Sequence, residues 1–153
     1  MVEKQQFSTF VVDNLFFGIE VEKVQEVLRY QEMTRVPLAP PVVQGLINLR
    51  GQIVTAIDLR RRMDLRARGE TELPMNVVVR TNGGAVSLLV DDIGDVVDVE
   101  DSSFETPPDT LKSDIRALIR GVHKLQGRLM HVLETEKVLD LAEVTDGSVV
   151  SAS

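Results

Sequence analysis

The chain has 153 residues, a formal net charge of −7, and 43 % hydrophobic and 27 % charged residues. This length fits one ordinary domain or two very small ones, and the apolar fraction excludes wholesale disorder. The chain has no Cys, which excludes disulfides, Cys-ligated metal sites and thiol nucleophiles; its acidic charge disfavours general binding of nucleic acid, because Lys and Arg hold the phosphate backbone.

Short apolar segments alternate with turn signals along the chain, and 24 residues are Val. Such segments predict β-strands. In chain order the predicted strands are 7–12, 16–21, 24–30, 46–49, 53–59, 75–81, 85–90, 96–100, 122–125 and 129–133. Turn chemistry separates several of them, at Asp13-Asn14, Arg50-Gly51 and Asn82-Gly83-Gly84. Many short, closely spaced strands indicate a sandwich or small barrels.

Two short segments favour helix, 58–64 and 134–143, and in the second the apolar residues fall on one broad face. The Pro-rich segment 36–41 excludes regular helix and central strand. Segments 66–74 and 101–113 are predicted to be polar loops, and 143–153 a flexible tail.

The chain contains an internal duplication. Segment 43–65 aligns with 119–141 at one constant interval, so that Gly45 falls on Gly121 and Gly51 on Gly127. Segment 17–28 aligns with 86–97 at an interval that is shorter by seven positions. This difference predicts an insertion within 101–113. Halves of this size are near the lower limit for an independent core, so we expect the two copies to share an interface with a groove at the seam.

The duplication also shows where the copies differ. Asn48-Leu49-Arg50-Gly51 in the first copy becomes Lys124-Leu125-Gln126-Gly127 in the second. An Arg next to a hairpin Gly tends to be exposed, and its planar, permanently charged group suits carboxylates. Arg50 is therefore either a solvated turn residue or part of a docking surface.

The sequence offers little catalytic chemistry. Asp58 and Glu134 are paired by the repeat at the starts of the predicted helices, which is typical of N-caps. His123 and His131 lie on one predicted hairpin without an obvious third metal ligand. We therefore expect no metal and no cofactor, and the absence of a catalytic constellation favours binding over catalysis.

Two charged segments leave alternatives open. The acidic run 91–101 lacks the spacing of an EF-hand, so solvated acids are the expected interpretation, with a small hydrolase or metal enzyme as the competing hypothesis. The basic cluster 60–68 has no aromatic platform for RNA and is expected to be a solvated helix face.

The motifs Gly45-Leu-Ile-Asn-Leu-Arg-Gly51, Ile57-Asp-Leu-Arg60 and Phe17–Leu28 together resemble the CheW family of chemotaxis coupling proteins. The resemblance extends to Thr34-Arg35-Val36-Pro37, to 90–96 and to 129–139, and covers residues 5–142. It implies a mainly β fold of two SH3-like five-stranded barrels with short helices, related by the duplication. We place the first barrel at about 14–82 and the second at 5–13 with 83–142.

The resemblance implies a non-enzymatic adaptor. Its expected partners are the regulatory domain of a CheA-type histidine kinase and the cytoplasmic tip of a chemoreceptor, with no nucleic acid and no direct insertion into the membrane. No apolar run approaches the roughly 20 residues that span a bilayer, and the N-terminus lacks a secretion signal, so we expect a cytoplasmic protein recruited to membrane-associated receptor arrays. A coupling protein of a non-chemotactic pathway, such as motility or development, is the alternative.

Four positions match motif positions that the family uses for contact. Arg50 and Gly45 correspond to its coupling surface, and Val24 and Glu26 to positions linked to receptor or kinase contact. The sequence does not separate the two partners residue by residue.

Overall fold

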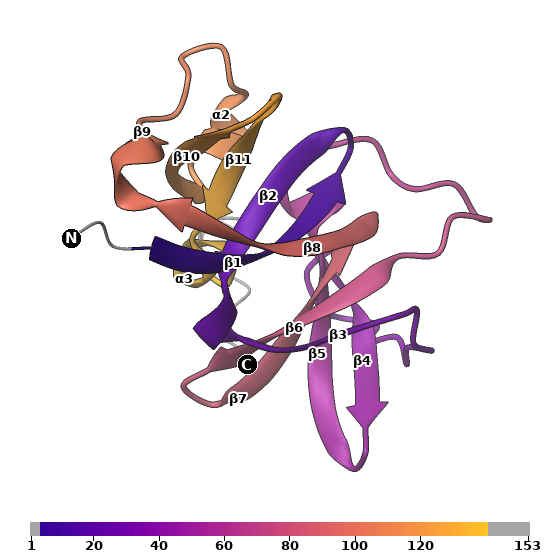
Figure 1. Cartoon of the computed structure of the whole chain (residues 1–153). Coiled ribbons are helices and arrows are strands. Elements are labelled where there is room, and N and C mark those ends of the chain that lie inside the picture. The colour runs from indigo at the N-terminus through magenta and orange to yellow at the C-terminus, as the bar shows by residue number, and fades with distance from the viewer. Residues whose placement is uncertain (1–3, 141–153) are drawn as a thin grey trace.

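The computed structural model describes residues 4–140 as two β-sheets with short helices between them (Figure 1). The strands are β1 (Lys4–Val12), β2 (Leu15–Glu20), β3 (Val24–Leu28), β4 (Val43–Leu49), β5 (Gln52–Asp58), β6 (Met75–Thr81), β7 (Gly84–Val90), β8 (Asp92–Glu100), β9 (Phe104–Glu105), β10 (Ile119–Leu125) and β11 (Arg128–Leu133). The helical turns are η1 (Val21–Lys23), α1 (Leu59–Arg62), η2 (Asp101–Ser103), α2 (Ser113–Arg116) and α3 (Thr135–Val138). Within residues 4–140, no helix is long and apolar enough to cross a bilayer.

The two sheets have the same strand order. The five-stranded sheet runs β3-β6-β7-β5-β4, and the six-stranded sheet runs β8-β1-β2-β11-β10-β9. Neighbouring strands are antiparallel except for one parallel pair in each sheet, β5 with β7 and β11 with β2. Each sheet closes into a barrel because the chain that leaves one edge strand returns to the other edge. Thr34, after β3, bridges to Leu46 on β4, and β9, after β8, pairs with β10.

The strand register confirms the duplication. In the parallel pairs Thr55 lies opposite Val86 in one barrel, and His131 lies opposite Phe17 in the other. Thr55 and His131 are separated by the longer of the two intervals found in the sequence, and Phe17 and Val86 by the shorter. The register shift at Gly45 on β4 recurs at Gly121 on β10. The repeated sequence therefore specifies the same pairing twice.

The sheets place the barrel boundaries differently from the sequence prediction of 14–82 and 5–13 with 83–142. β2 pairs with β1 and belongs to the second barrel, whereas β7 pairs with β6 and belongs to the first. The predicted boundaries follow the turns at 13–14 and 82–84, but a tight turn joins strands of one sheet. The chain changes barrels at η1 and at Asp91 instead.

The strand pairing divides the insertion predicted in the second copy into two parts, one before and one after β9. Thr34 and Glu105 occupy equivalent positions opposite Leu46 and Val122, and the interval between them is intermediate between the two found in the sequence. A smaller part of the insertion therefore precedes this point, and a larger part follows it in the segment that leads to α2. The predicted loop 101–113 consequently contains η2 and β9, which the sequence did not predict.

Other element boundaries differ from the prediction for local reasons. β4 and β10 begin three residues earlier than expected, because the bulges at Gly45 and Gly121 interrupt the apolar pattern. β8 begins at Asp92 instead of 96, because its first residues are polar on an exposed edge. The strand predicted at 24–30 ends at Leu28, and helix α3 covers only Thr135–Val138 of the predicted 134–143. The predicted tail 143–153 lies outside the described residues.

The core has three parts. One cluster, with Ile47, Val54 and Val78, fills the first barrel, and another, with Phe7 and Met130, fills the second. The largest cluster lies between them and draws on both sheets and on the helices. Its members include Phe10, Val12, Phe17, Ile19, Ile57, Leu59, Met63, Val77, Val79, Leu88, Val90, Ile115, Leu118 and Val138. The two copies thus share one core, as their small size requires.

Candidate interaction surface

The turn between β4 and β5 presents Arg50 to solvent. Arg50 and Gly51 have φ of 52° and 91°, and paired positive φ values suit a tight hairpin turn between right-twisted strands. The side chain of Asn48 supports the turn, since its Oδ1 accepts a hydrogen bond of 2.8 Å from the Gly51 amide. The Arg50 side chain is 69 % exposed. The turn is built to display this residue.

Arg50 pairs with Glu26, which lies on β3 at the opposite edge of the same sheet. The ion pair therefore joins the two edges where the barrel closes. The hydrogen bond from Arg50 lowers the pKa of the Glu26 carboxyl, against a smaller opposing effect of burial. Glu26 is more sheltered than its partner, at 22 % exposed. The guanidinium of Arg50 is therefore accessible to solvent and is held in position by the more buried Glu26.

Apolar side chains are exposed near both members of the pair. Val27 follows Glu26 on β3 and is 41 % exposed. Ile53, on β5 just after the turn, is 61 % exposed and lies opposite Asn48. A charged group beside exposed apolar groups is a common composition for a protein–protein contact.

The other two predicted site residues have structural positions. Gly45 is buried beneath the segment after β3, where an added Cβ would lie 2.8 Å from the Thr34 carbonyl oxygen and 3.0 Å from Met33 Cβ. Val24 packs against the shared core, and its carbonyl accepts a hydrogen bond of 2.9 Å from Arg80. The structure thus brings Glu26 and Arg50 together, while Gly45 and Val24 support the strands around them.

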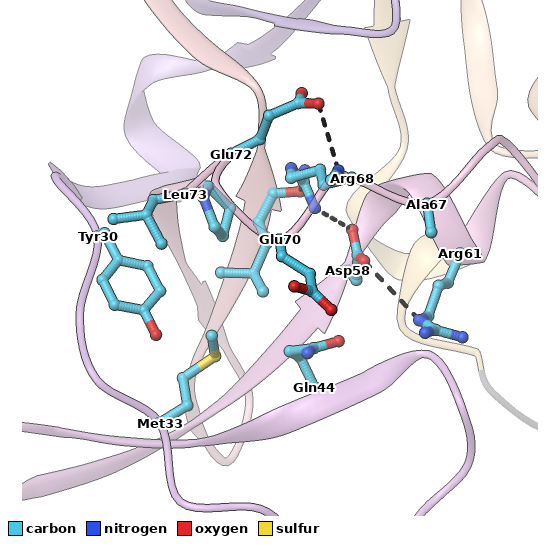
Figure 2. A pocket seen from close by; sticks show the side chains of 13 residues that line it. Tyr30, Met33, Gln44, Asp58, Arg61, Ala67, Arg68, Glu70, Glu72 and Leu73 are labelled. Atoms are coloured by element: carbon cyan, nitrogen blue, oxygen red, sulfur yellow. Dashed lines mark hydrogen bonds and ion pairs between the residues drawn. The ribbon is translucent and has the colours of Figure 1, made fainter.

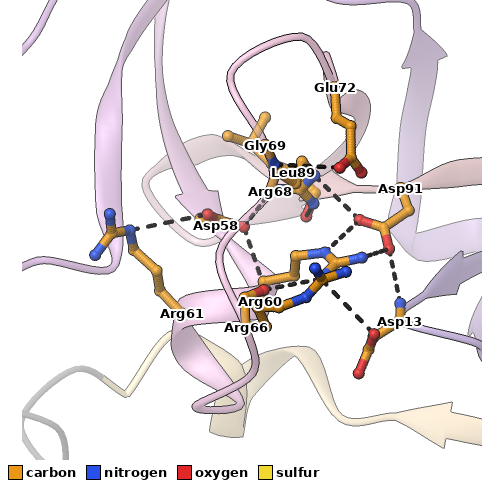
Figure 3. A network of polar contacts seen from close by, with 10 residues as sticks. All are labelled: Asp13, Asp58, Arg60, Arg61, Arg66, Arg68, Gly69, Glu72, Leu89 and Asp91. Carbon is orange, nitrogen blue, oxygen red and sulfur yellow. Dashed lines mark hydrogen bonds and ion pairs between the residues drawn. The ribbon is translucent and has the colours of Figure 1, made fainter.

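A buried charge network clamps the two barrels together (Figure 3). Arg60 of α1 donates to both carboxylate oxygens of Asp91, at 2.9 and 2.6 Å, and lies 3.7 Å from Asp13 in the β1–β2 turn. Arg68 donates to Asp58 at 2.7 Å and lies 3.0 Å from Asp91. The sequence predicted solvated groups for Arg60, Arg68 and Asp91, and this was wrong. Periodicity does not show that loop 66–74 folds back over α1.

The network shifts the protonation of its members. Partial burial opposes ionisation of Asp91, but the hydrogen bonds from Arg60 and from the Asp13 amide outweigh it and lower the pKa of this carboxyl. The same contact raises the pKa of Arg60. Asp58 also accepts from the Arg60 amide at 3.1 Å, which confirms its predicted N-cap role. Glu134 occupies the equivalent cap position without a side-chain hydrogen bond.

The two histidines do not form a site together. His123 lies opposite Met130 and His131 opposite Val122, so their side chains point to opposite faces of the hairpin. His123 is buried, with Nδ1 2.7 Å from Ser103 Oγ, and burial lowers its pKa, as does the charge of Arg120. Among residues 4–140, no group of three His, Asp or Glu side chains is placed to hold a metal ion.

Two SH3-like barrels around a shared core define the class of tandem-barrel β proteins, and the exposed ion pair at the closure of one barrel adds a candidate contact surface. Comparison with known proteins assigns the family. The model of the CheW-like domain matches residues 6–143, so the chain belongs to the CheW-like family. This confirms the resemblance and the fold class expected from the motifs.

Individual relatives are similar to this chain over most of its length. The chain is 30 % identical over 136 residues to the chemotaxis protein CheW of Bacillus subtilis (strain 168), covering 89 % of this chain and 87 % of that protein. It is 29 % identical over 139 residues to the chemotaxis protein CheW of Rhizobium meliloti (strain 1021), covering 91 % and 90 %. The crystal structure of the scaffolding protein TtCheW from Thermoanaerobacter tengcongensis superposes with a TM-score of 0.81 at 24 % identity, covering 96 % and 97 %. The last match supports the fold.

Proposed function

We propose that this chain is a non-enzymatic chemotaxis adaptor that couples the cytoplasmic tip of methyl-accepting chemoreceptors to a CheA-type histidine kinase. The observation that carries the proposal is the exposed Arg50–Glu26 pair in a member of the CheW-like family. Family membership suggests the partners, and the geometry supplies a surface suited to contact. The protein would act in the cytoplasm, held at receptor arrays by its partners.

The proposed surface offers hydrogen-bond donors and exposed apolar side chains to a partner protein. The Arg50 guanidinium has five N–H donors, and within residues 4–140 it donates to Glu26, so donors remain for a carboxylate of a partner. Val27 and Ile53, which are close to Glu26 and Arg50 in the sequence, are exposed apolar side chains. Gly45 and Val24 then affect coupling through the position of β3 and β4, since Gly45 is buried and Val24 packs against the core.

A charge swap tests the proposal. Arg50→Glu and Glu26→Arg each place two like charges together and should weaken co-sedimentation with receptor-tip and kinase fragments by about tenfold or more. The matched control Gln126→Glu changes the equivalent turn of the second barrel and should bind as the native chain does. The double variant restores the pair but reverses its direction, so it should remove the like-charge repulsion without recovering binding.

The outcomes separate function from folding. Arg50 is exposed, so Arg50→Glu should leave the thermal midpoint within a few degrees of the native value. Undiminished capture of both fragments by Arg50→Glu would remove this surface from the proposal. Failure of the native chain to capture either fragment would remove the proposed partners.

A further inference from the structure

A pocket at the far end of the β4–β5 hairpin from Arg50 has the chemistry to receive a basic side chain (Figure 2). It measures about 250 Å³ and is bounded by the segment after β3, the start of β4, the junction of β5 with α1, loop 66–74 and the end of β7. This volume lies below the usual range of small-molecule sites and suits a single side chain. Gln44 near the start of β4 and Arg50 just after its end are six residues apart, which corresponds to about 20 Å of extended chain. The pocket is therefore separate from the surface around Arg50.

One side of the pocket is apolar. Tyr30 and Met33 form one wall, with Leu73 beside them, and Leu73 is 60 % exposed. Figure 2 shows Glu70 between Tyr30 and Asp58, with Gln44 below. An aromatic ring and a carboxylate that line one pocket match the planar cation of an arginine side chain, which can stack on a ring and pair with a carboxylate.

The charge left uncommitted in the pocket is negative. Asp58 is neutralised by Arg68 at 2.7 Å and lies 4.0 Å from Arg61. Glu72 accepts from the Gly69 amide at 3.2 Å. Glu70 makes no hydrogen bond or ion pair with any residue in the range 4–140. Within that range, the lining thus holds three carboxylates against the two guanidinium groups of Arg61 and Arg68, and of the two carboxylates without an ion-paired cation, Glu70 and Glu72, only Glu70 also lacks a hydrogen bond.

The rim of the pocket is held in place before any ligand arrives. Arg68 fastens loop 66–74 to the barrel through Asp58 and through the Leu89 carbonyl at 3.2 Å. Arg60 adds a hydrogen bond of 2.8 Å to the Arg66 carbonyl. A preformed rim reduces the entropy lost on binding. The buried arginines therefore belong to the fold, whereas Glu70 is left for a partner.

We propose that this pocket binds an arginine side chain presented by a protein partner, with its guanidinium against Tyr30 and paired with Glu70. Arginine is favoured over lysine because a planar guanidinium stacks on an aromatic ring and pairs with a carboxylate at the same time. A metal ion is disfavoured because the described residues place no three ligating groups together. The proposal stands independently of the proposed function, since it concerns a different surface.

The test is an NMR titration of the isotopically labelled full chain with N-acetyl-arginine amide, whose terminal charges are blocked. Saturable shifts confined to the amides of Tyr30, Gly69 and Glu70 and their neighbours are expected at millimolar concentration. N-acetyl-citrulline amide has nearly the same shape without the charge and should produce no such shifts. Glu70→Gln and Tyr30→Leu should each weaken binding by about threefold.

Charge reversal supplies the sharper comparison. Glu70→Arg should abolish the shifts, whereas Asp98→Arg, the same change at an exposed position of β8 in the other barrel, should leave the affinity unchanged. Absence of saturable shifts with the arginine probe would overturn the proposal. The assignment of an arginine pocket would be overturned if the native chain bound N-acetyl-citrulline amide or N-acetyl-lysine amide as tightly as the arginine probe. It would also be overturned if the Glu70→Arg variant bound the arginine probe as tightly as the native chain does.

Discussion

The two barrels share a strand order and a register but differ at one solvent-exposed turn and within the core. The β4–β5 turn carries Arg50 paired with Glu26, whereas the equivalent β10–β11 turn carries Gln126. In the core, Ile47 of the first barrel is replaced by His123 in the second, tied to Ser103. The register shifts at Gly45 and Gly121 and the parallel strand pairing recur in both barrels. The recurring pairing shows that both copies follow the same fold, and the difference at the turn is the basis for proposing a contact surface on the first barrel alone.

The shared core makes the barrels depend on each other, and breaking it has the largest expected effect. Phe17 is fully buried in the cluster between the sheets and stacks on Phe10, with ring centroids 5.6 Å apart. Phe17→Ala should lower the free energy of unfolding by about 3–5 kcal/mol. Denaturant unfolding should show a single transition for both barrels. The half-exposed Phe104, changed to Ala, serves as the control and should cost less than about 1 kcal/mol.

Separate unfolding of the two barrels in Phe17→Ala would contradict the shared core. Hydrogen exchange measured on β5 and on β11 distinguishes the cases, because these strands belong to different sheets. Protection should fall on both strands together.

The clamp between the barrels should come next in size. Asp91→Asn leaves Arg60 and Arg68 with reduced charge compensation in a largely buried site. Loss of one member of a buried pair costs about 3–5 kcal/mol, and the partial exposure of Asp91 reduces the expectation to about 2 kcal/mol. Chemical denaturation at pH 7 measures this change.

The same variant should alter the pH dependence of stability. The pKa of Asp91 is lowered in the folded state, so its contribution is complete above the ordinary value of 3.8 and is lost as pH falls through the lower folded value. Asp91→Asn should therefore flatten the acid limb of the stability curve. An unchanged acid limb would show that Asp91 is not stabilised by its partners.

The bulge glycines allow a matched comparison of smaller effect. In Gly45→Ala the new Cβ would lie 2.8 Å from the Thr34 carbonyl oxygen, and in Gly121→Ala it would meet the Phe104 ring and lie 2.7 Å from the Glu105 carbonyl oxygen. Each change should cost about 1–3 kcal/mol through overpacking. Gly45→Ala alone should also weaken partner binding, because the displaced segment continues from β3, which carries Glu26. Equal effects of both variants on binding would assign the loss to general destabilisation.

The sequence predicted the parts of the structure that repeat or follow a local rule. The duplication emerged because Gly45, Gly51 and their counterparts fix turns and bulges that both barrels need. Asp58 was predicted as a cap because capping depends on neighbours in sequence. The predicted barrel boundaries were wrong, because the sequence does not show which sheet the β1–β2 and β6–β7 hairpins join.

Long-range pairing could not be predicted from the sequence. Arg60 and Asp91 are 31 residues apart, and Arg50 and Glu26 are 24 apart, so neither pair leaves a local pattern. β9 has two residues and no apolar alternation, and it exists because β10 offers an open edge. The pocket beside Tyr30 combines five separate segments. The residues of such features are far apart in the sequence, and only the folded structure shows that they lie together.

The asymmetry between the two turns is the central claim, and exchanging the turn residues tests it most directly. Arg50→Gln gives the first barrel the residue of the second, and Gln126→Arg does the reverse. The measurement is the rate of kinase autophosphorylation in a reconstituted mixture of receptor fragment, histidine kinase and each variant. Arg50→Gln should lower stimulation by about tenfold, which corresponds to about 1.4 kcal/mol of binding, with an unchanged thermal midpoint, and Gln126→Arg should match the native chain. Full stimulation by a correctly folded Arg50→Gln protein would contradict the account.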